Sequence, residues 1–141
     1  MADSSSVDAA LAALLSADPV IQGLLPDGGY FDLAAKDSRR YLLLSLLDHD
    51  DSYVFEGTGW ETFLYLVKAV TLDSSPKAAM DAAARVHALL QDKELVVPGY
   101  WPMKTQRIEH IRILDTDEPT AVRWQQVGGH YELWLQPLTT P

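Results

Sequence analysis

Apolar and polar residues alternate along two runs near the C-terminal end of the chain, and a pair of glycines separates the runs. The stretch extends from Val122 to Gln136, with Gly128 and Gly129 between the runs. A type I′ turn needs positive φ at both central residues, which glycine adopts without steric cost. The pattern therefore predicts a β-hairpin with the glycines at its turn. In this register one face carries Val122, Trp124, Tyr131, Leu133 and Leu135. The other face carries Arg123 opposite Trp134 and Gln125 opposite Glu132.

Helical spacing of apolar residues marks the N-terminal part of the chain. Ser5 or Ser6 can cap a helix that starts at Val7, and its apolar stripe consists of Val7, Leu11, Leu14 and Leu15. Asp18 and Pro19 then have the pattern of an N-cap and a first helical residue. They predict a second, short helix that continues to Leu24.

A third helix is predicted from Ser75 as N-cap and Pro76 at the first helical position. Its inner face is expected to consist of Ala79, Ala83, Val86 and Leu90. The spacing of four residues predicts a charged ladder on the outer face, formed by Lys77, Asp81 and Arg85.

Apolar segments in the middle of the chain predict strands. Residues 40–47 are continuously apolar after a basic pair, which fits a strand buried on both faces, although a helix also fits this length. Residues 53–55 predict a second short strand, and the segment 60–70 predicts a long one. One face of the long strand carries Phe63, Tyr65, Val67 and Ala69, and the other carries Leu64, Leu66 and Val70.

A strand that is apolar on both faces must be covered on both. The predicted helices can cover one face, so a neighbouring subunit is expected to cover the other. A turn at 98–102, a strand at 103–114 and an acidic loop at 115–119 precede the predicted hairpin. The elements predict one α+β domain over residues 1–141: a mainly antiparallel β-sheet with two principal helices packed on one face, and loose tails at 1–5 and 137–141.

Composition narrows the class of function. The net charge of −9 disfavours direct nucleic-acid binding, which needs clustered lysine and arginine, and it disfavours docking on an anionic membrane. The chain has no cysteine, which rules out a disulfide framework and a thiolate metal site. The N-terminus lacks the basic region of a signal peptide, and no apolar run approaches the ~20 residues of a membrane span. We therefore expect a cytosolic protein at the time of synthesis.

Candidate chemistry is sparse. His49, Asp50 and Asp51 form the best local cluster of metal ligands, but a solvated turn between two strands is the favoured interpretation. Gly57 and Gly59 are interpreted as a turn, because a dinucleotide-binding loop follows a strand instead of preceding one. The carboxylates Asp115, Asp117 and Glu118 alternate as in calcium loops but lack the glycine and the distal glutamate of an EF-hand. No catalytic residue, metal site or cofactor is predicted, although any two of the 20 carboxylates could meet in space as a general acid–base pair.

Trp134 is the aromatic residue with the clearest alternative roles. It lies on the polar side of the predicted hairpin, where it could stack on Arg123 or contact a partner. For Trp60 and Trp124, a place in the core is the preferred interpretation.

The chain resembles the small tail terminator, or tail completion, proteins of long-tailed bacteriophages and related prophage elements. The resemblance covers most of the chain from Asp8 to Gln136 and rests on the order and spacing of several segments. These are residues 11–20, which read LAALLSADPV; 24–26 and 28–30; the apolar segments 41–47 and 65–70; the helical segment 83–90; and, near the end, 107–109 and 124–131.

This resemblance implies a structural protein with an α+β fold, without catalysis and without a cofactor. Such proteins form a homo-hexameric ring that caps the tail tube at its set length, stops further addition of the major tail tube protein and provides the surface that joins the head connector or stopper. The location implied is the head-proximal end of the virion tail, after assembly in the host cytoplasm.

A ring of this kind needs head-to-tail contacts between different patches of each subunit. The candidate interface residues are Arg123, Trp134, Leu64, Leu66 and Val70. DNA has to pass the lumen without specific binding, and carboxylates in loops would give a repulsive lining; the candidates are Asp50, Asp51, Asp115, Asp117 and Glu118. The alternatives are another head–tail connector component, such as an adaptor or stopper, and a small α+β ligand-binding or enzyme domain.

Overall fold

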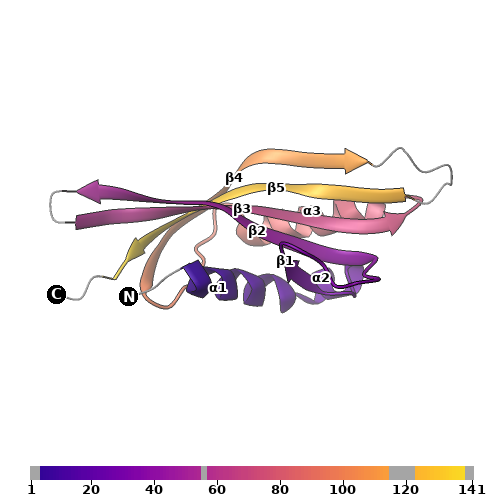
Figure 1. Ribbon diagram of the computed structural model, residues 1–141, viewed down its shortest axis with the longest axis horizontal. Coiled ribbons are helices and arrows are strands. Elements are labelled where there is room, and N and C mark those ends of the chain that lie inside the picture. Colours follow the sequence, from indigo (N-terminus) through magenta and orange to yellow (C-terminus); the bar gives the residue numbers. More distant parts are fainter. Residues whose placement is uncertain (1–3, 55–56, 115–122, 139–141) are drawn as a thin grey trace.

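The computed structural model describes residues 4–54, 57–114 and 123–138 and has a mixed α/β fold. Figure 1 shows a long, curled, mostly antiparallel sheet with three helices. The helices are α1 (Ser4–Ser16), α2 (Pro19–Leu24) and α3 (Lys77–Leu90). The strands are β1 (Gly29–Phe31), β2 (Arg40–Val54), β3 (Gly57–Asp73), β4 (Tyr100–Leu114) and β5 (Arg123–Pro137).

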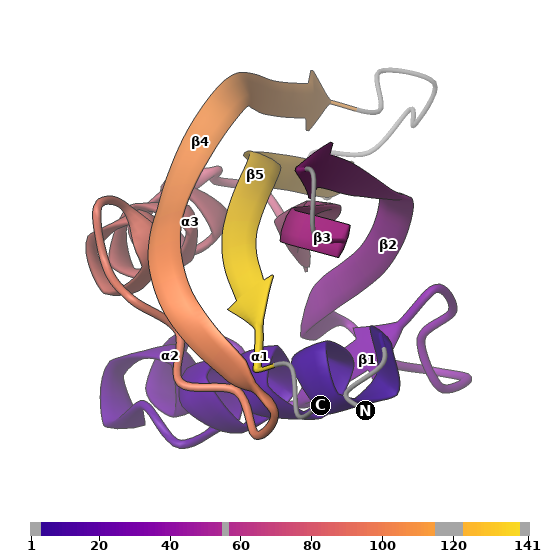
Figure 2. The same cartoon turned by 90° about the vertical axis from the view of Figure 1, so that its left-hand side faces the viewer.

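The sheet has the strand order β1-β2-β3-β5-β4, so β3 and β5 lie at its centre. The short β1 pairs with β2 in parallel, and the other neighbours pair antiparallel. Seen along the strands, β4 curves around β5 (Figure 2). The register shifts in β2 and in β4 mark irregularities that accompany this curl.

A core of apolar side chains joins the helices to one face of the sheet. The odd-numbered positions Phe63, Tyr65, Val67 and Ala69 of β3 are buried, as the period of two predicts. The buried residues of the helices belong to the same cluster: Val7, Leu11 and Leu15 of α1, Ile21 of α2, and Ala79, Ala82, Val86 and Leu90 of α3. Ala82 is buried where the sequence predicts Ala83, which is half-buried.

The predicted start of the second helix is confirmed, whereas α1 begins at Ser4 instead of Val7 and α3 has Pro76 instead of Ser75 as its N-cap. Asp18 caps α2, and its carboxylate accepts a hydrogen bond from the Ile21 amide at 3.1 Å. The Ser75 hydroxyl accepts one from the Lys77 amide at 3.2 Å, although α3 itself begins at Lys77. The predicted ladder on α3 is wrong at one position, because Arg85 pairs with Asp18 instead of continuing the Lys77–Asp81 pair.

The predicted hairpin at Gly128 and Gly129 is wrong. Both glycines lie in the middle of β5, which is one continuous strand between β3 and β4. A Cβ at Gly128 would lie 2.1 Å from the Val67 carbonyl oxygen, and one at Gly129 would lie 2.5 Å from the Glu109 carbonyl oxygen. The glycines therefore permit a close approach of strand backbones, which is the other common reason for glycine in a strand.

The predicted break at residues 48–52 is also wrong. Residues 40–54 form the single strand β2, so His49, Asp50 and Asp51 lie in a strand and not in a turn. Gly57 and Gly59 belong to β3, and the strand predicted from residue 103 already begins at Tyr100. The polar residues 48–52 continue the strand because β2 pairs with β3 along nearly its whole length. The segment 115–122 lies outside the described residues, including Asp115, Asp117, Glu118 and Val122.

Candidate assembly surface

The second face of β3 carries the even-numbered apolar residues that the sequence assigns to a subunit contact. Leu64 and Leu66 are half-buried there. Leu64 lies beside Asp48 of β2 and Glu132 of β5, and Leu66 lies beside Ser45 and His130. The buried residues of the three described helices all belong to the core on the opposite face. This second sheet face, centred on Leu64 and Leu66, is called the open face below.

Val70 does not belong to the exposed part of the open face, because only 3% of it is exposed. It pairs with Tyr41, which makes edge-to-face contacts with Tyr30 and Trp124 at centroid distances of 6.1 and 6.4 Å. Burial raises the pKa of Tyr41. The aromatic group and Val70 thus pack within one chain, and Val70 offers no surface to a partner.

Lys68, a partly desolvated cation, lies on the open face between Leu66 and Val70 of β3. The Lys68 ammonium donates a hydrogen bond to the Gln126 side-chain oxygen at 2.6 Å. Burial lowers the pKa of Lys68, since desolvation disfavours its charged form. A subunit that covered this face would remove more water from Lys68 and lower its pKa further.

Arg123 and Trp134 are not brought together. The Cα partner of Arg123 is Asp73, whereas that of Trp134 is Thr62, at the other end of β3. Eleven residues of one strand separate them, which is about 36 Å at the rise of a β-strand. The predicted stacking is therefore wrong, because it depended on the hairpin. Trp134 is 38% exposed, and its indole N–H donates to the Glu132 carboxylate.

The acidic candidates that the structure describes lie in the outer part of the β2–β3 pair. We call this part, residues 48–54 and 57–64, the arm; Figure 1 shows that it extends past α1. Asp50 is exposed. Its protonated form donates a hydrogen bond to the neighbouring Asp48 carboxylate, and this bond, together with the negative charge of Asp48, raises the pKa of Asp50. Asp51 pairs directly with Glu61 on the adjacent strand.

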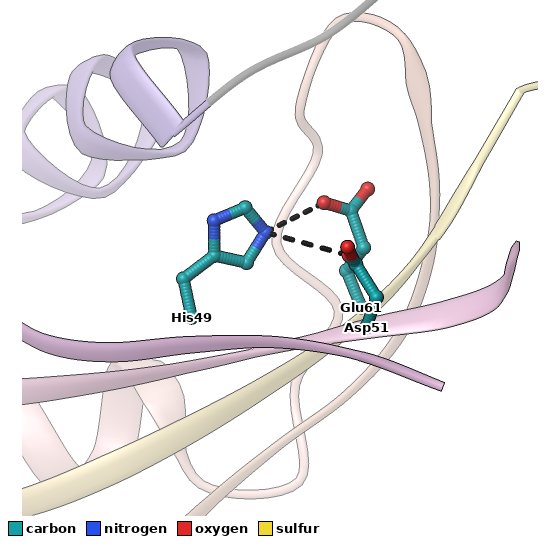
Figure 3. Close-up of side chains that lie close together, drawn as sticks. All are labelled: His49, Asp51 and Glu61. Atoms are coloured by element: carbon teal, nitrogen blue, oxygen red, sulfur yellow. Dashed lines mark hydrogen bonds and ion pairs between the residues drawn. The ribbon is translucent and has the colours of Figure 1, made fainter. Parts of the chain in front are cut away.

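His49, Asp51 and Glu61 form a cluster on the arm, on the same sheet face as the core (Figure 3). His49 Nε2 lies 2.6 Å from Glu61 Oε1 and 3.9 Å from Asp51 Oδ1. The imidazole stacks on Phe63 at a centroid distance of 4.1 Å. Glu61 is ten residues from Asp51 in the sequence and is not among the predicted candidates, because only the pairing of β2 with β3 brings it to the cluster.

A hollow between α3, β4 and β5 is the place where a small ligand could be sought. It is lined by basic groups and apolar residues, among them Arg107, His110, Arg112, Met80 and Val127. The described lining contains no carboxylate that could act with them as a general acid–base pair. Nearby, His87 Nδ1 lies 3.2 Å from the Tyr131 hydroxyl. Burial, followed by the charges of Arg107 and His110, lowers the pKa of His87.

The described part of the chain thus presents an α/β fold with an open sheet face and a projecting arm. No helix in it is long and apolar enough to cross a membrane. No protein-family model matches the chain. No curated protein matches it either.

The solved structures that share the fold include the following two. One is a chain from the virion of a native gene transfer agent particle, with a TM-score of 0.68 and 20% sequence identity over 94% of this chain and 96% of that one. The other is a protein described only by a sequence identifier, with a TM-score of 0.58 and 13% identity over 100% of this chain and 99% of that one. The similarity extends over nearly the full length of all three chains.

Proposed function

We propose that this chain is a structural protein of a phage-like virion and that it forms a ring that caps the tail tube. The observation that carries the proposal is the fold shared with the gene transfer agent virion chain, nearly end to end in both. The sequence resemblance to tail terminator proteins points in the same direction. In this role the ring ends tube polymerisation and provides the surface that joins the tail to the head.

The open face is proposed as one of the two patches that a ring requires of each subunit. In a closed ring each subunit presents two different patches, one to each neighbour. Leu64 and Leu66 are half-buried within one chain, so a neighbouring subunit can remove further apolar area from water. The proposed assembly is a homo-hexamer at the head-proximal end of the tail, with the tail tube protein on one side and a connector or stopper on the other.

The lumen candidates that the structure describes, Asp50 and Asp51, are proposed to line the lumen from the arm. Asp48 and Asp50 lie close enough to interact, and a ring would repeat this negative pair in every subunit. Such a lining repels phosphate, so DNA can pass without binding. A ring structure with these carboxylates on the outer rim and a basic bore would contradict the proposal.

The direct test is native mass spectrometry and negative-stain imaging of the purified protein, alone and with tail tubes. We expect a sixfold ring in solution or on the tube tip. Leu66→Asp should prevent ring formation, because it would bury an unpaired carboxylate in the contact. Trp134→Ser should weaken assembly more than it lowers the stability of the monomer, since the indole is partly exposed.

The matched control is Leu33→Asp, the same substitution at a leucine that is 83% exposed and outside the sheet. It should leave assembly unchanged. Thermal unfolding of each variant separates a lost contact from a lost fold. A protein that stays monomeric at high concentration and does not bind tube tips would contradict the terminator role. Binding to the portal side instead would favour an adaptor or stopper.

A further inference from the structure

The His49, Asp51 and Glu61 side chains converge from two adjacent strands. His49 and Asp51 are two positions apart on β2, so they project from the same side of the strand. Glu61 is the direct cross-strand partner of Asp51 on β3. One ligand atom from each residue lies within 4.8 Å of the others, and Figure 3 shows the three groups directed toward one another.

Glu61 is the fixed member of this cluster. Only 11% of its side chain is exposed, against 32% for His49 and 40% for Asp51. A carboxylate with so little access to water needs a compensating positive charge or strong hydrogen-bond donors. The imidazole supplies one donor at 2.6 Å. A second carboxylate, that of Asp51, lies 3.9 Å from the same imidazole nitrogen. It adds negative charge to the cluster, which favours a divalent cation there.

The donor set is mixed, with one imidazole nitrogen and two carboxylate groups. Zinc accepts this combination at bond lengths of about 2.0–2.2 Å, which separates neighbouring ligands of a tetrahedral ion by about 3.4 Å. The separations from His49 Nε2 are 2.6 Å to Glu61 and 3.9 Å to Asp51, on either side of that value. Small rotations of the two more exposed side chains would equalise them. The exposed side of the cluster leaves the fourth position to water.

We propose that His49, Asp51 and Glu61 bind one zinc ion per chain. The stacking of the imidazole on Phe63 fixes the plane of the ring and turns Nε2 toward the carboxylates. The ion would connect β2 to β3 in the arm, where no third described strand pairs with the outer edge of β2. Because all three ligands come from one chain, zinc binding does not depend on assembly.

The experiment uses the full chain without a histidine tag, freed of metal with a chelator. Calorimetric titration with zinc chloride at neutral pH should show one site per chain, and Mg²⁺ should not compete, since it prefers oxygen ligands alone. Asp51→Asn and His49→Gln should each weaken zinc binding by more than the 10–100-fold that loss of an outer partner typically costs. Zinc should also raise the unfolding temperature of the wild type and not of these variants.

The matched control is His130→Gln. His130 also has a carboxylate partner, with Nδ1 3.0 Å from Glu109 Oε2, but no third ligand group joins this pair among the described residues. This variant should bind zinc as the wild type does. Circular dichroism establishes that each variant is folded; Asp51→Asn alters the most exposed ligand and serves as the decisive one. Absence of zinc binding to the wild type, or equal binding by wild type and Asp51→Asn, would overturn the proposal.

Discussion

Among the glycines whose surroundings the structure describes, the adjacent Gly128 and Gly129 leave the least room for a side chain. Replacing Gly128 by alanine would place a methyl group 2.1 Å from a backbone oxygen of β3, and replacing Gly129 would place one 2.5 Å from a backbone oxygen of β4. Backbone on both sides of a central strand cannot move without loss of pairing. We expect each substitution to destabilise the protein by about 3 kcal/mol or to prevent folding, measured by urea unfolding.

The control for these glycines is Gly23→Ala. Gly23 lies within α2, and a Cβ there would meet nothing within 4 Å. Alanine in a helix should stabilise it by up to about 1 kcal/mol relative to glycine. If Gly128→Ala unfolds at the same urea concentration as the wild type, the close approach of β3 and β5 is wrong.

Asp18 joins two helices through its charge. It caps α2, and its carboxylate accepts two hydrogen bonds from Arg85 of α3, at 3.0 and 2.7 Å. The guanidinium is the main reason that the pKa of Asp18 lies below its ordinary value of 3.8. The stabilisation is therefore fully present above pH 3.8 and is lost as the pH falls below this value toward the pKa of the folded state.

We expect Asp18→Asn to lower the urea midpoint at neutral pH, because asparagine keeps the cap but loses the charge that Arg85 requires. The difference from the wild type should shrink as the pH falls below 3.8. Asp18→Ala, which removes the cap as well, should be the less stable of the two variants. A difference that is independent of pH would show that the ion pair contributes nothing.

At the scale of elements, the strand pattern was predictable and the pairing of strands was not. Alternation along 60–70 assigned Phe63, Tyr65 and Val67 to the buried face, and the structure confirms this. The same alternation on both sides of Gly128 and Gly129 is equally compatible with a hairpin and with one long strand. Only the backbone of β3 and β4 on either side distinguishes the two.

The cluster of His49, Asp51 and Glu61 also depends on how the strands pair. Their proximity in sequence marks His49 and Asp51 as possible ligands, but a polar run in the middle of a strand has the pattern of a turn. Glu61 joins them through the register of β2 with β3. Cross-strand neighbours of this kind become visible in a sequence only after the register is known.

The packing of α3 on β5 contains a partly buried contact between two titratable groups, His87 and Tyr131. Burial keeps the pKa of His87 below its ordinary value of 6.5, and burial also raises the pKa of Tyr131. Below pH 6.5 the unfolded chain takes up a proton that the folded chain resists, so stability falls until the pH reaches the pKa of the folded state.

We expect His87→Gln to flatten this part of the stability profile. Glutamine can still hydrogen-bond with the Tyr131 hydroxyl, but it does not titrate. Urea midpoints measured on both sides of pH 6.5 should therefore differ less in the variant than in the wild type. An unchanged pH dependence would mean that His87 does not carry this effect.

At the scale of the whole molecule, this chain and the gene transfer agent virion chain share the fold at 20% identity. The buried face of the sheet, the inner faces of α1 and α3 and the strand glycines impose size and polarity, while the remaining surface can vary. That surface decides which partners bind. The open face, with Leu64 and Leu66 at its centre, is therefore the part of this chain that most directly tests the assembly proposal.

The net charge of −9 allows a second test of the assembly proposal, through the salt dependence of assembly. Subunits of the same sign repel one another, and salt screens that repulsion over a Debye length of about 8 Å at physiological ionic strength. If apolar contact at the open face holds the proposed ring, raising the salt concentration should strengthen its assembly, as measured by light scattering or native mass spectrometry. Weaker assembly with salt would mean that complementary charges hold the subunits together. The basic side chains of β4, including Lys104 and Arg112, would then be the residues to reverse in charge.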